Sequence, residues 1–166
     1  MTELDELQSL LERVEKEKGT DREIDADLDV ALRGGEIQWR QANYTMDMHP
    51  VARRPSGNHL GGYEHEHVPL YTASIDAALA LVERVLPGCG IVIDREPPAK
   101  GGVPAGAAVN GWIGAEGPEG RAWEHVDVTG PTFPLAILAA LLKALIAQKQ
   151  GTTYTVGDPE GREGEE

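Results

Sequence analysis

Cysteine is almost absent from this sequence, and its scarcity bounds where the protein works. The single cysteine, Cys89, excludes any disulfide within the chain and suits a reducing compartment. Its surroundings, Pro-Gly-Cys-Gly, offer no neighbouring base that would activate a nucleophile. We therefore interpret Cys89 as a small buried residue and expect a cytoplasmic protein.

Basic residues are also few. Fifteen lysines and arginines stand against 28 aspartates and glutamates, which gives a formal net charge of −13. Proteins that bind a phosphate backbone carry a basic footprint, so we do not expect direct nucleic-acid binding. The acidic balance is compatible with high solubility, with a basic partner, or with imitation of a nucleic acid.

Long hydrophobic runs are missing too. The most apolar stretch, Phe133 to Ala147, is interrupted by Lys143 and is shorter than the roughly 20 residues that span a bilayer. The first residues, MTELDELQSLLERVEKEKG, are acidic and amphipathic, unlike a signal peptide. These features predict a protein without a membrane partner.

Motifs for catalysis and phosphate binding are likewise lacking. The 20 glycines form no G-x-x-x-x-G-K-[ST] loop, and no G-x-S-x-G turn occurs. We interpret the glycines as turn residues. The sequence therefore indicates no catalytic residue and no cofactor, and it leans toward a protein that is not an enzyme.

What the sequence does contain is helical spacing of apolar residues in four segments. The first helix is predicted to end at Gly19, and the second to begin with a capping box of Thr20 and Glu23 and to end at Gly34-Gly35. The buried stripe predicted for the first helix consists of Leu4, Leu7, Leu11 and Val14.

The other two helices have clear N-caps. Ser74 is expected to cap a helix that runs to about Leu86, and Thr132 to cap the last and most buried helix, from Phe133 to about Gln148. The stripe predicted to be buried on the third helix consists of Ile75, Leu79, Val82 and Leu86.

Short apolar segments predict strands between the helices. Residues 36–70 hold three prolines and no sustained period, so we interpret them as a loop-rich insert around one or two short strands. A second proline- and glycine-rich loop covers 96–106. The candidate strands are Ile37–Trp39, Asn43–Met46, Ile91–Ile93, and a hairpin of Ala107–Ile113 with Arg121–Val128.

These elements predict an α+β fold in one domain, residues 1–150. Burying the stripes of all the helices favours a three-layer α-β-α sandwich, in which helices cover a small antiparallel or mixed sheet. The tail, 151–166, is acidic and has no core pattern, so we expect it to be disordered. A homodimer is left open, because the last helix is so apolar.

The run Glu64-His65-Glu66-His67 is a candidate metal site. On an extended segment its histidines point to one side and its glutamates to the other. Tetrahedral zinc needs three or four ligands, and no second motif with ligand spacing is present, so we favour a solvent-exposed segment and no metal. If the insert folded back, the site could be completed by His49, His59, Glu66 or His125.

Three aspartates, Asp21, Asp25 and Asp29, recur one helical turn apart. Like charges at this spacing mildly destabilise a helix, and we interpret the stripe as a solvated face. The alternative is an acidic surface that imitates a nucleic acid and occupies a basic groove on a partner.

Basic and aromatic residues cluster in the insert and could form a ligand or partner surface. Arg53 and Arg54 are adjacent, and Tyr63 follows shortly. Trp39 and Tyr44 lie in the same region, whereas Trp112 is interpreted as sheet core. The cluster supports either a protein contact or a small-ligand site.

Three segments together resemble a known family. They are Asp21–Asp25 with Val30–Leu32, Tyr71–Val82 (YTASIDAALALV), and Thr132–Ala147 (TFPLAILAALLKALIA). The chain is similar over residues 4–148, with a gap at the insert, to the phage ABA sandwich domain proteins, which are related in layout to the NinX-like phage proteins. Phe133 separates threonine from proline, a departure from the family pattern.

The resemblance implies a three-layer sandwich and an accessory protein of a phage or prophage, located in the cytoplasm of the bacterial host. It carries over no catalytic residue and no cofactor. We therefore expect the protein to act by binding a host or phage macromolecule, with a protein as its partner. The alternative is a protein that binds or sequesters a small, nucleotide-type ligand in anti-defence, and a metal-dependent enzyme ranks last.

Overall fold

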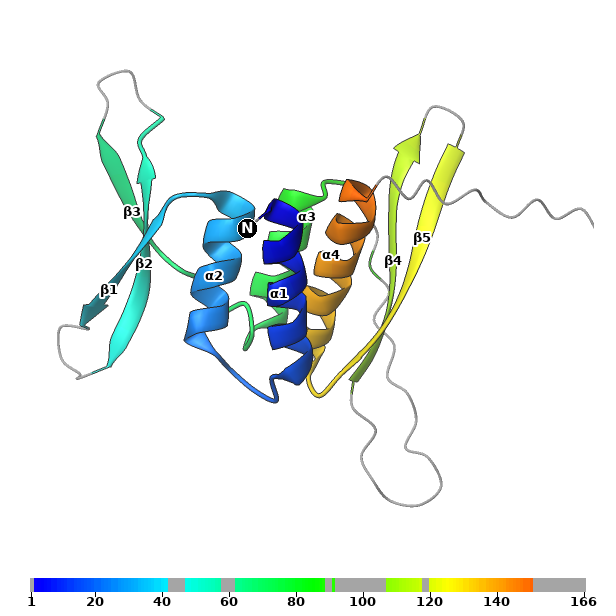
Figure 1. The fold of residues 1–166 in the computed structure, drawn as a ribbon, viewed down its shortest axis with the longest axis horizontal. Helices are drawn as coiled ribbons and strands as arrows, with labels where there is room; N and C mark the ends of the chain where they lie inside the picture. The colour runs from blue at the N-terminus through cyan, green and yellow to red at the C-terminus, as the bar shows by residue number, and fades with distance from the viewer. Residues whose placement is uncertain are drawn as a thin grey trace, which may run out of the picture.

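The computed structural model describes residues 2–41, 47–57, 62–88, 91, 107–117 and 120–150, with the backbone alone at 107–117, 120–127 and 129. The elements in chain order are α1 (Glu3–Lys16), α2 (Arg22–Arg33), β1 (Glu36–Gln41), β2 (Met48–Pro55), β3 (Tyr63–His67), α3 (Ile75–Val85), β4 (Ala107–Gly117), β5 (Gly120–Gly130) and α4 (Phe133–Lys149). Figure 1 shows them along the chain.

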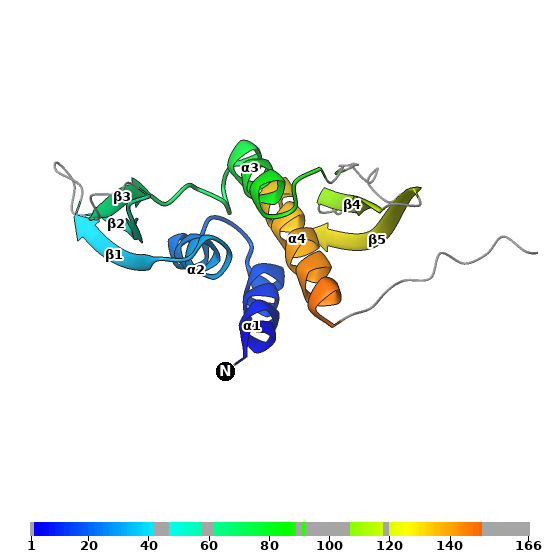
Figure 2. The ribbon, with the colours of Figure 1, turned by 90° about the horizontal axis from the view of Figure 1, so that it is seen from above.

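Helices and a small antiparallel sheet confirm the α+β class. The sheet has the order β1-β2-β3, and α2 lies against it. Strands β4 and β5 form a separate antiparallel pair that packs on α4. The strands are thus divided between two sheets, with the helices between them (Figures 1 and 2). The insert supplies a whole sheet of its own, which the prediction of one central sheet did not include.

Helix α4 is the centre of the core, as predicted. It is buried along nearly its whole length, because α1, α3 and the β4–β5 pair pack around it. A Cβ atom built on Gly130, at the end of β5, would lie 3.1 Å from Ala136, so the strand and the helix approach closely there. The core residues from the other helices include Leu7, Leu10, Val14, Ile24, Leu28, Ala78, Leu81 and Val82.

The caps explain where the helices begin. Ser74 accepts a hydrogen bond from the Ala77 N–H, and Thr132 accepts one from the Leu135 N–H, as predicted. The predicted capping box at Thr20 is wrong: Asp21 is the N-cap of α2, and its carboxylate accepts the Glu23 and Ile24 N–H groups. A carboxylate is favoured at this position because it also meets the helix dipole.

The stripe predicted for α3 is right in part: Val82 is buried, and Leu79 and Leu86 pack partly buried against the core. Ala78, Leu81 and Val82 are buried, whereas Ile75 is 39% exposed. Small Ala78 is fully buried on the helix that packs against α4, and a small side chain allows two helix backbones to approach. The sequence supports two overlapping stripes, and only packing selects between them.

The insert is more regular than predicted. Ile37–Trp39 falls within β1, as expected, but β2 and β3 replace the expected loops. Pro55 is tolerated in the central strand because β1 already ends opposite Arg53, so that only β3 pairs there. Pro50 lies one residue beyond the last pair of β2 with β3, where its carbonyl, and not an N–H, makes the backbone bond to Val68. Ile91 is not in a strand. Several predicted features lie outside the described residues: the strand at 43–46, the rest of 91–93, the loop 96–106, Cys89 and the tail 151–166.

Candidate functional site: two faces of the insert sheet

Strand alternation sorts the polar residues of the insert onto two faces of the β1-β2-β3 sheet. Arg54 pairs with Glu64, and Ala52 with Glu66, so these four share one face. Arg53 pairs with His65, and Val51 with His67, on the other. Because Arg54 and Glu66 bond to α2 residues, the first is the inner face. Arg53 and Arg54, adjacent in sequence, therefore lie on opposite sides.

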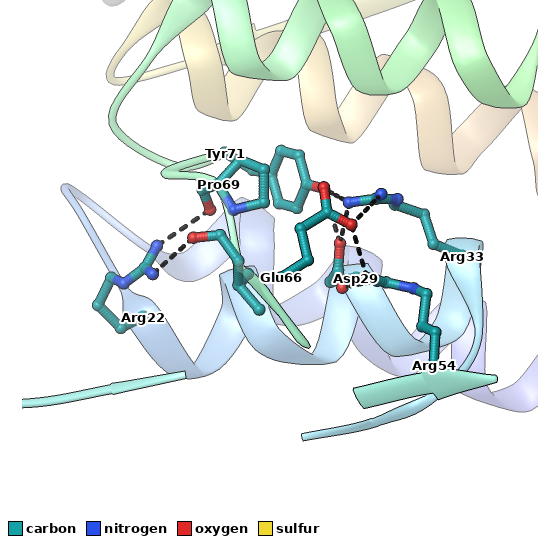
Figure 3. Close-up of polar contacts among 8 residues, drawn as sticks. Arg22, Asp29, Arg33, Arg54, Glu66, Pro69 and Tyr71 are labelled. Carbon is teal, nitrogen blue, oxygen red and sulfur yellow. Dashed lines mark hydrogen bonds and ion pairs between the residues drawn. The ribbon is translucent and has the colours of Figure 1, made fainter. Parts of the chain in front are cut away.

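The inner face is joined to α2 by a network of charges around Asp29 (Figure 3). The Asp29 carboxylate, which is 0% exposed, accepts hydrogen bonds from Arg54 Nη2, from Arg33 Nη1 at 2.9 Å and from the Tyr71 hydroxyl at 2.8 Å. Three donors from β2, α2 and the segment before α3 thus converge on one carboxylate. This arrangement offsets the cost of removing the charge from water.

Glu66 completes the network from β3. Its Oε2 accepts Arg33 Nη2 at 2.8 Å and Arg54 Nη1 at 3.0 Å. Two carboxylates therefore balance two guanidinium groups. Among the described side chains, Arg54 Nε is the buried polar atom that has no hydrogen-bond partner.

A second buried pair lies one turn earlier on α2. Asp25, also 0% exposed, accepts Arg22 Nη1 at 2.6 Å and the Thr72 N–H at 2.7 Å. Arg22 also donates to the carbonyls of Pro69 (3.0 Å) and Val68 (2.8 Å). This pair fixes the chain between β3 and α3 onto α2.

Burial changes the titration of two groups in these networks. It raises the pKa of Tyr71 to about 12, and the hydrogen bond to Asp29 acts in the same direction, because a phenolate would face a carboxylate. Burial also raises the pKa of Asp25 above its usual value, although the bonds from Thr72 and Arg22 oppose part of this shift.

The aspartates do not form the predicted solvated stripe. Asp21 caps α2, and Asp25 and Asp29 are buried. The nucleic-acid-mimic hypothesis required these carboxylates at the surface, so burial removes its basis. The reason is that arginines pair with the aspartates: Arg22 and Arg33 do so from α2 itself, and Arg54 does so from β2.

The second face, here called the outer face, consists of Glu36, Gln38, Arg40, His49, Val51, Arg53, Pro55, Tyr63, His65 and His67. Figures 1 and 2 show α2 on one side of the sheet and no described helix or strand on the other. Arg53 contacts Glu36 at 3.2 Å, and its guanidinium carbon lies 3.6 Å from the centre of the Tyr63 ring. Tyr63 is 57% exposed.

The histidines of the insert share this face. The rings of His49 and His67 have centroids 5.0 Å apart, and His65 lies opposite Arg53. His65, His67 and their neighbours in β3 are exposed. Within the part of the chain that the structure describes, no three histidine, cysteine, aspartate or glutamate side chains are placed to hold a metal ion. The glutamates of the motif point to the inner face, away from the histidines.

The sequence prediction named Arg53, Arg54 and Tyr63 as one cluster. It did not predict that Arg54 lies on the opposite face of the sheet from Arg53 and Tyr63. It assigned no role in the site to Arg33, Tyr71 or Thr72, although Tyr71 and Thr72 begin the segment that carries the family resemblance, and it considered His49 only as a metal ligand. The alternation of His65 and His67 against Glu64 and Glu66 was the signal that divides the two faces, and it is confirmed by the register. Tyr44 lies outside the described residues, as does the side chain of Trp112.

No protein-family model, curated protein sequence or solved structure matches this chain. The resemblance to the phage ABA sandwich domain proteins therefore stays a prediction. None of the described helices has the length and apolar character needed to cross a bilayer.

Proposed function

We propose that this protein is a phage- or prophage-encoded accessory protein that acts by binding a protein partner through the outer face. The observation that supports this is an exposed sheet face with Arg40, Arg53 and Tyr63, on which no described helix packs. Arginine and tyrosine are enriched at protein interfaces and at their energetic hot spots. The inner face, by contrast, uses its charges for internal contacts.

The small-ligand alternative loses its main support. It required Arg53 and Arg54 to act together on an anion, but the strand places them on opposite faces. Arg54 is occupied by Asp29 and Glu66, so Arg53 alone of the pair faces outward. The resemblance to phage proteins supports an accessory role, and the outer face supports a binding mode for it.

Capture of partners from a bacterial host lysate tests this proposal. The tagged full chain is compared with the double variant Arg53→Glu/Tyr63→Ala and with Arg84→Glu, which makes the same arginine-to-glutamate change on the exposed side of α3. We expect the native chain and the Arg84→Glu variant to capture at least one host protein that the outer-face double variant does not capture. All three chains should unfold at similar urea concentrations.

Two outcomes would count against the proposal. If the three chains capture the same proteins, the outer face is not the contact surface. If the native chain enriches nothing over an untagged control, binding of a host protein is the wrong function.

A further inference from the structure

We propose, resting on the function above, that the outer face binds a short acidic peptide segment of the partner, and that protonation of its histidines strengthens this binding as the pH falls. The juxtaposition that carries the inference is His49, His65 and His67 on one sheet face together with Arg40 and Arg53. These five side chains come from three strands and are brought together only by the register.

The outer face has few acidic side chains. Glu36 is the carboxylate on the described strands of this face, and it already pairs with Arg53. Asp47 precedes β2 at its edge, and Glu64 and Glu66 point to the inner face. With neutral histidines, Arg40 and Arg53 against Glu36 leave one positive charge on the strands of this face, or none when Asp47 at the edge is counted; three protonated histidines add three positive charges.

This local charge is opposite to that of the whole chain, which carries −13. At physiological ionic strength charges are screened over about 8 Å. A short acidic segment that lies on the face is therefore attracted by the local cations, whereas a long nucleic acid extends beyond them and meets the acidic remainder. A peptide is the occupant that this charge distribution favours.

The direction of the pH dependence follows from the two kinds of group. Histidine takes up its proton near pH 6.5, while glutamate and aspartate in a peptide stay ionised down to about pH 4.5. A face with several histidines therefore gains positive charge on acidification while an acidic peptide keeps its negative charge. Each exposed ion pair changes a binding constant by roughly two- to fivefold, so two or three new pairs predict a gain on the order of tenfold.

The test measures fluorescence anisotropy of a labelled oligoglutamate peptide with the full chain, across about pH 7.5 to 5.5. Oligoglutamine and a single-stranded oligothymidylate of matched length serve as the other probes. The variant is His65→Gln/His67→Gln, which removes two exposed titrating groups from β3. The matched control is His125→Gln in β5, on the other side of the helices.

We expect oligoglutamate to bind on the order of tenfold more tightly at the lower pH and oligoglutamine not to bind. The double variant should lose most of the pH dependence, whereas His125→Gln should keep it.

The inference is overturned if oligoglutamate does not bind, if the oligothymidylate binds at least as tightly as oligoglutamate, or if the double variant keeps the full pH dependence. It is also overturned if sedimentation shows that the chain dimerises through this face at low pH and excludes the peptide. If the outer face captures a partner protein that has no acidic segment, this inference is wrong and the proposed function still holds.

Discussion

At the scale of single residues, neighbours in sequence have opposite roles. Arg54 binds two carboxylates inside the molecule, while Arg53 lies over an exposed tyrosine. On α2, Asp29 is fully buried, whereas the side chain of Asp27 is 52% exposed and contacts Arg13 at 2.5 Å. Residue type alone does not determine these roles; the face on which the backbone places each side chain does.

Tyr71 gives a pH-dependent prediction at this scale. Its pKa is raised from 10.0 to about 12 in the folded protein, so its contribution to stability is fully present below pH 10 and is lost as the pH rises toward 12. We expect the free energy of unfolding of the native chain to fall relative to Tyr71→Phe over this window, by on the order of 2 kcal/mol. Urea unfolding at a series of alkaline pH values measures the difference.

The control is Tyr63→Phe, because Tyr63 is exposed. This variant removes the hydroxyl of a tyrosine that does not contact Asp29, and it is measured over the same pH range. A Tyr71→Phe difference that does not change with pH would mean that the Tyr71 hydroxyl is not held against Asp29.

At the scale of elements, the α2–β1 junction is tightly constrained. Gly34 ends the helix with its N–H bonded to the Val30 carbonyl at 2.8 Å, and Gly35 follows with φ of +100°. A Cβ atom on Gly35 would lie 2.7 Å from the Arg53 carbonyl oxygen. The junction thus needs glycine both for its backbone angle and for the close approach of β2.

We expect Gly35→Ala to destabilise the protein by roughly 1–3 kcal/mol. Alanine is strained at this positive φ, and its methyl group would clash with the Arg53 carbonyl oxygen. Gly19→Ala is the matched control: nothing lies within 4 Å of its Cβ position, and it should be neutral or slightly stabilising. Chemical denaturation measures both. Equal stability of the two variants would contradict the close approach of β1 and β2 at Gly35.

At the scale of the whole molecule, the β1-β2-β3 sheet is attached to the helices largely by polar contacts. Its buried apolar contribution to the core is small, chiefly Ala52, with Val68 just beyond β3. The networks around Asp29 and Asp25 join α2 to β2, β3 and the segment that leads into α3. Charge pairing, more than apolar burial, therefore positions the outer face.

Removing the carboxylate of Asp29 should loosen the sheet selectively. Asp29→Ala leaves two guanidinium groups without their buried partner, and we expect a loss of about 3–5 kcal/mol. Hydrogen exchange should quicken most at β1, β2 and β3 amides and least in α4. Asp27→Ala, which breaks an exposed pair, should cost about 0–1 kcal/mol.

If Asp29→Ala does not fold, Asp29→Asn keeps the size and an acceptor, and the same exchange pattern is expected in weaker form. Protection lost evenly over the sheet and α4 would show that the network does not act as a local attachment.

The sequence alone determined the features that depend on local spacing. The caps at Ser74 and Thr132, the buried last helix, the β4–β5 hairpin and the alternation of histidines and glutamates in β3 all follow from side-chain period and capping chemistry. The caps and the alternation depend on residues within a few positions of one another, and the hairpin joins two strands that follow each other directly in sequence. Local backbone geometry is sufficient to predict them.

Only the tertiary structure decided the rest. Asp25 and Asp29 look like a solvated stripe until Arg54, Tyr71 and Thr72 from distant segments contact them. Likewise, α3 has two possible stripes until packing against α4 selects one. The outer face exists only because the register aligns three strands. The physical reason is that burial and ion pairing depend on which residues contact a side chain in the folded protein. The spacing of residues along the sequence does not identify those residues.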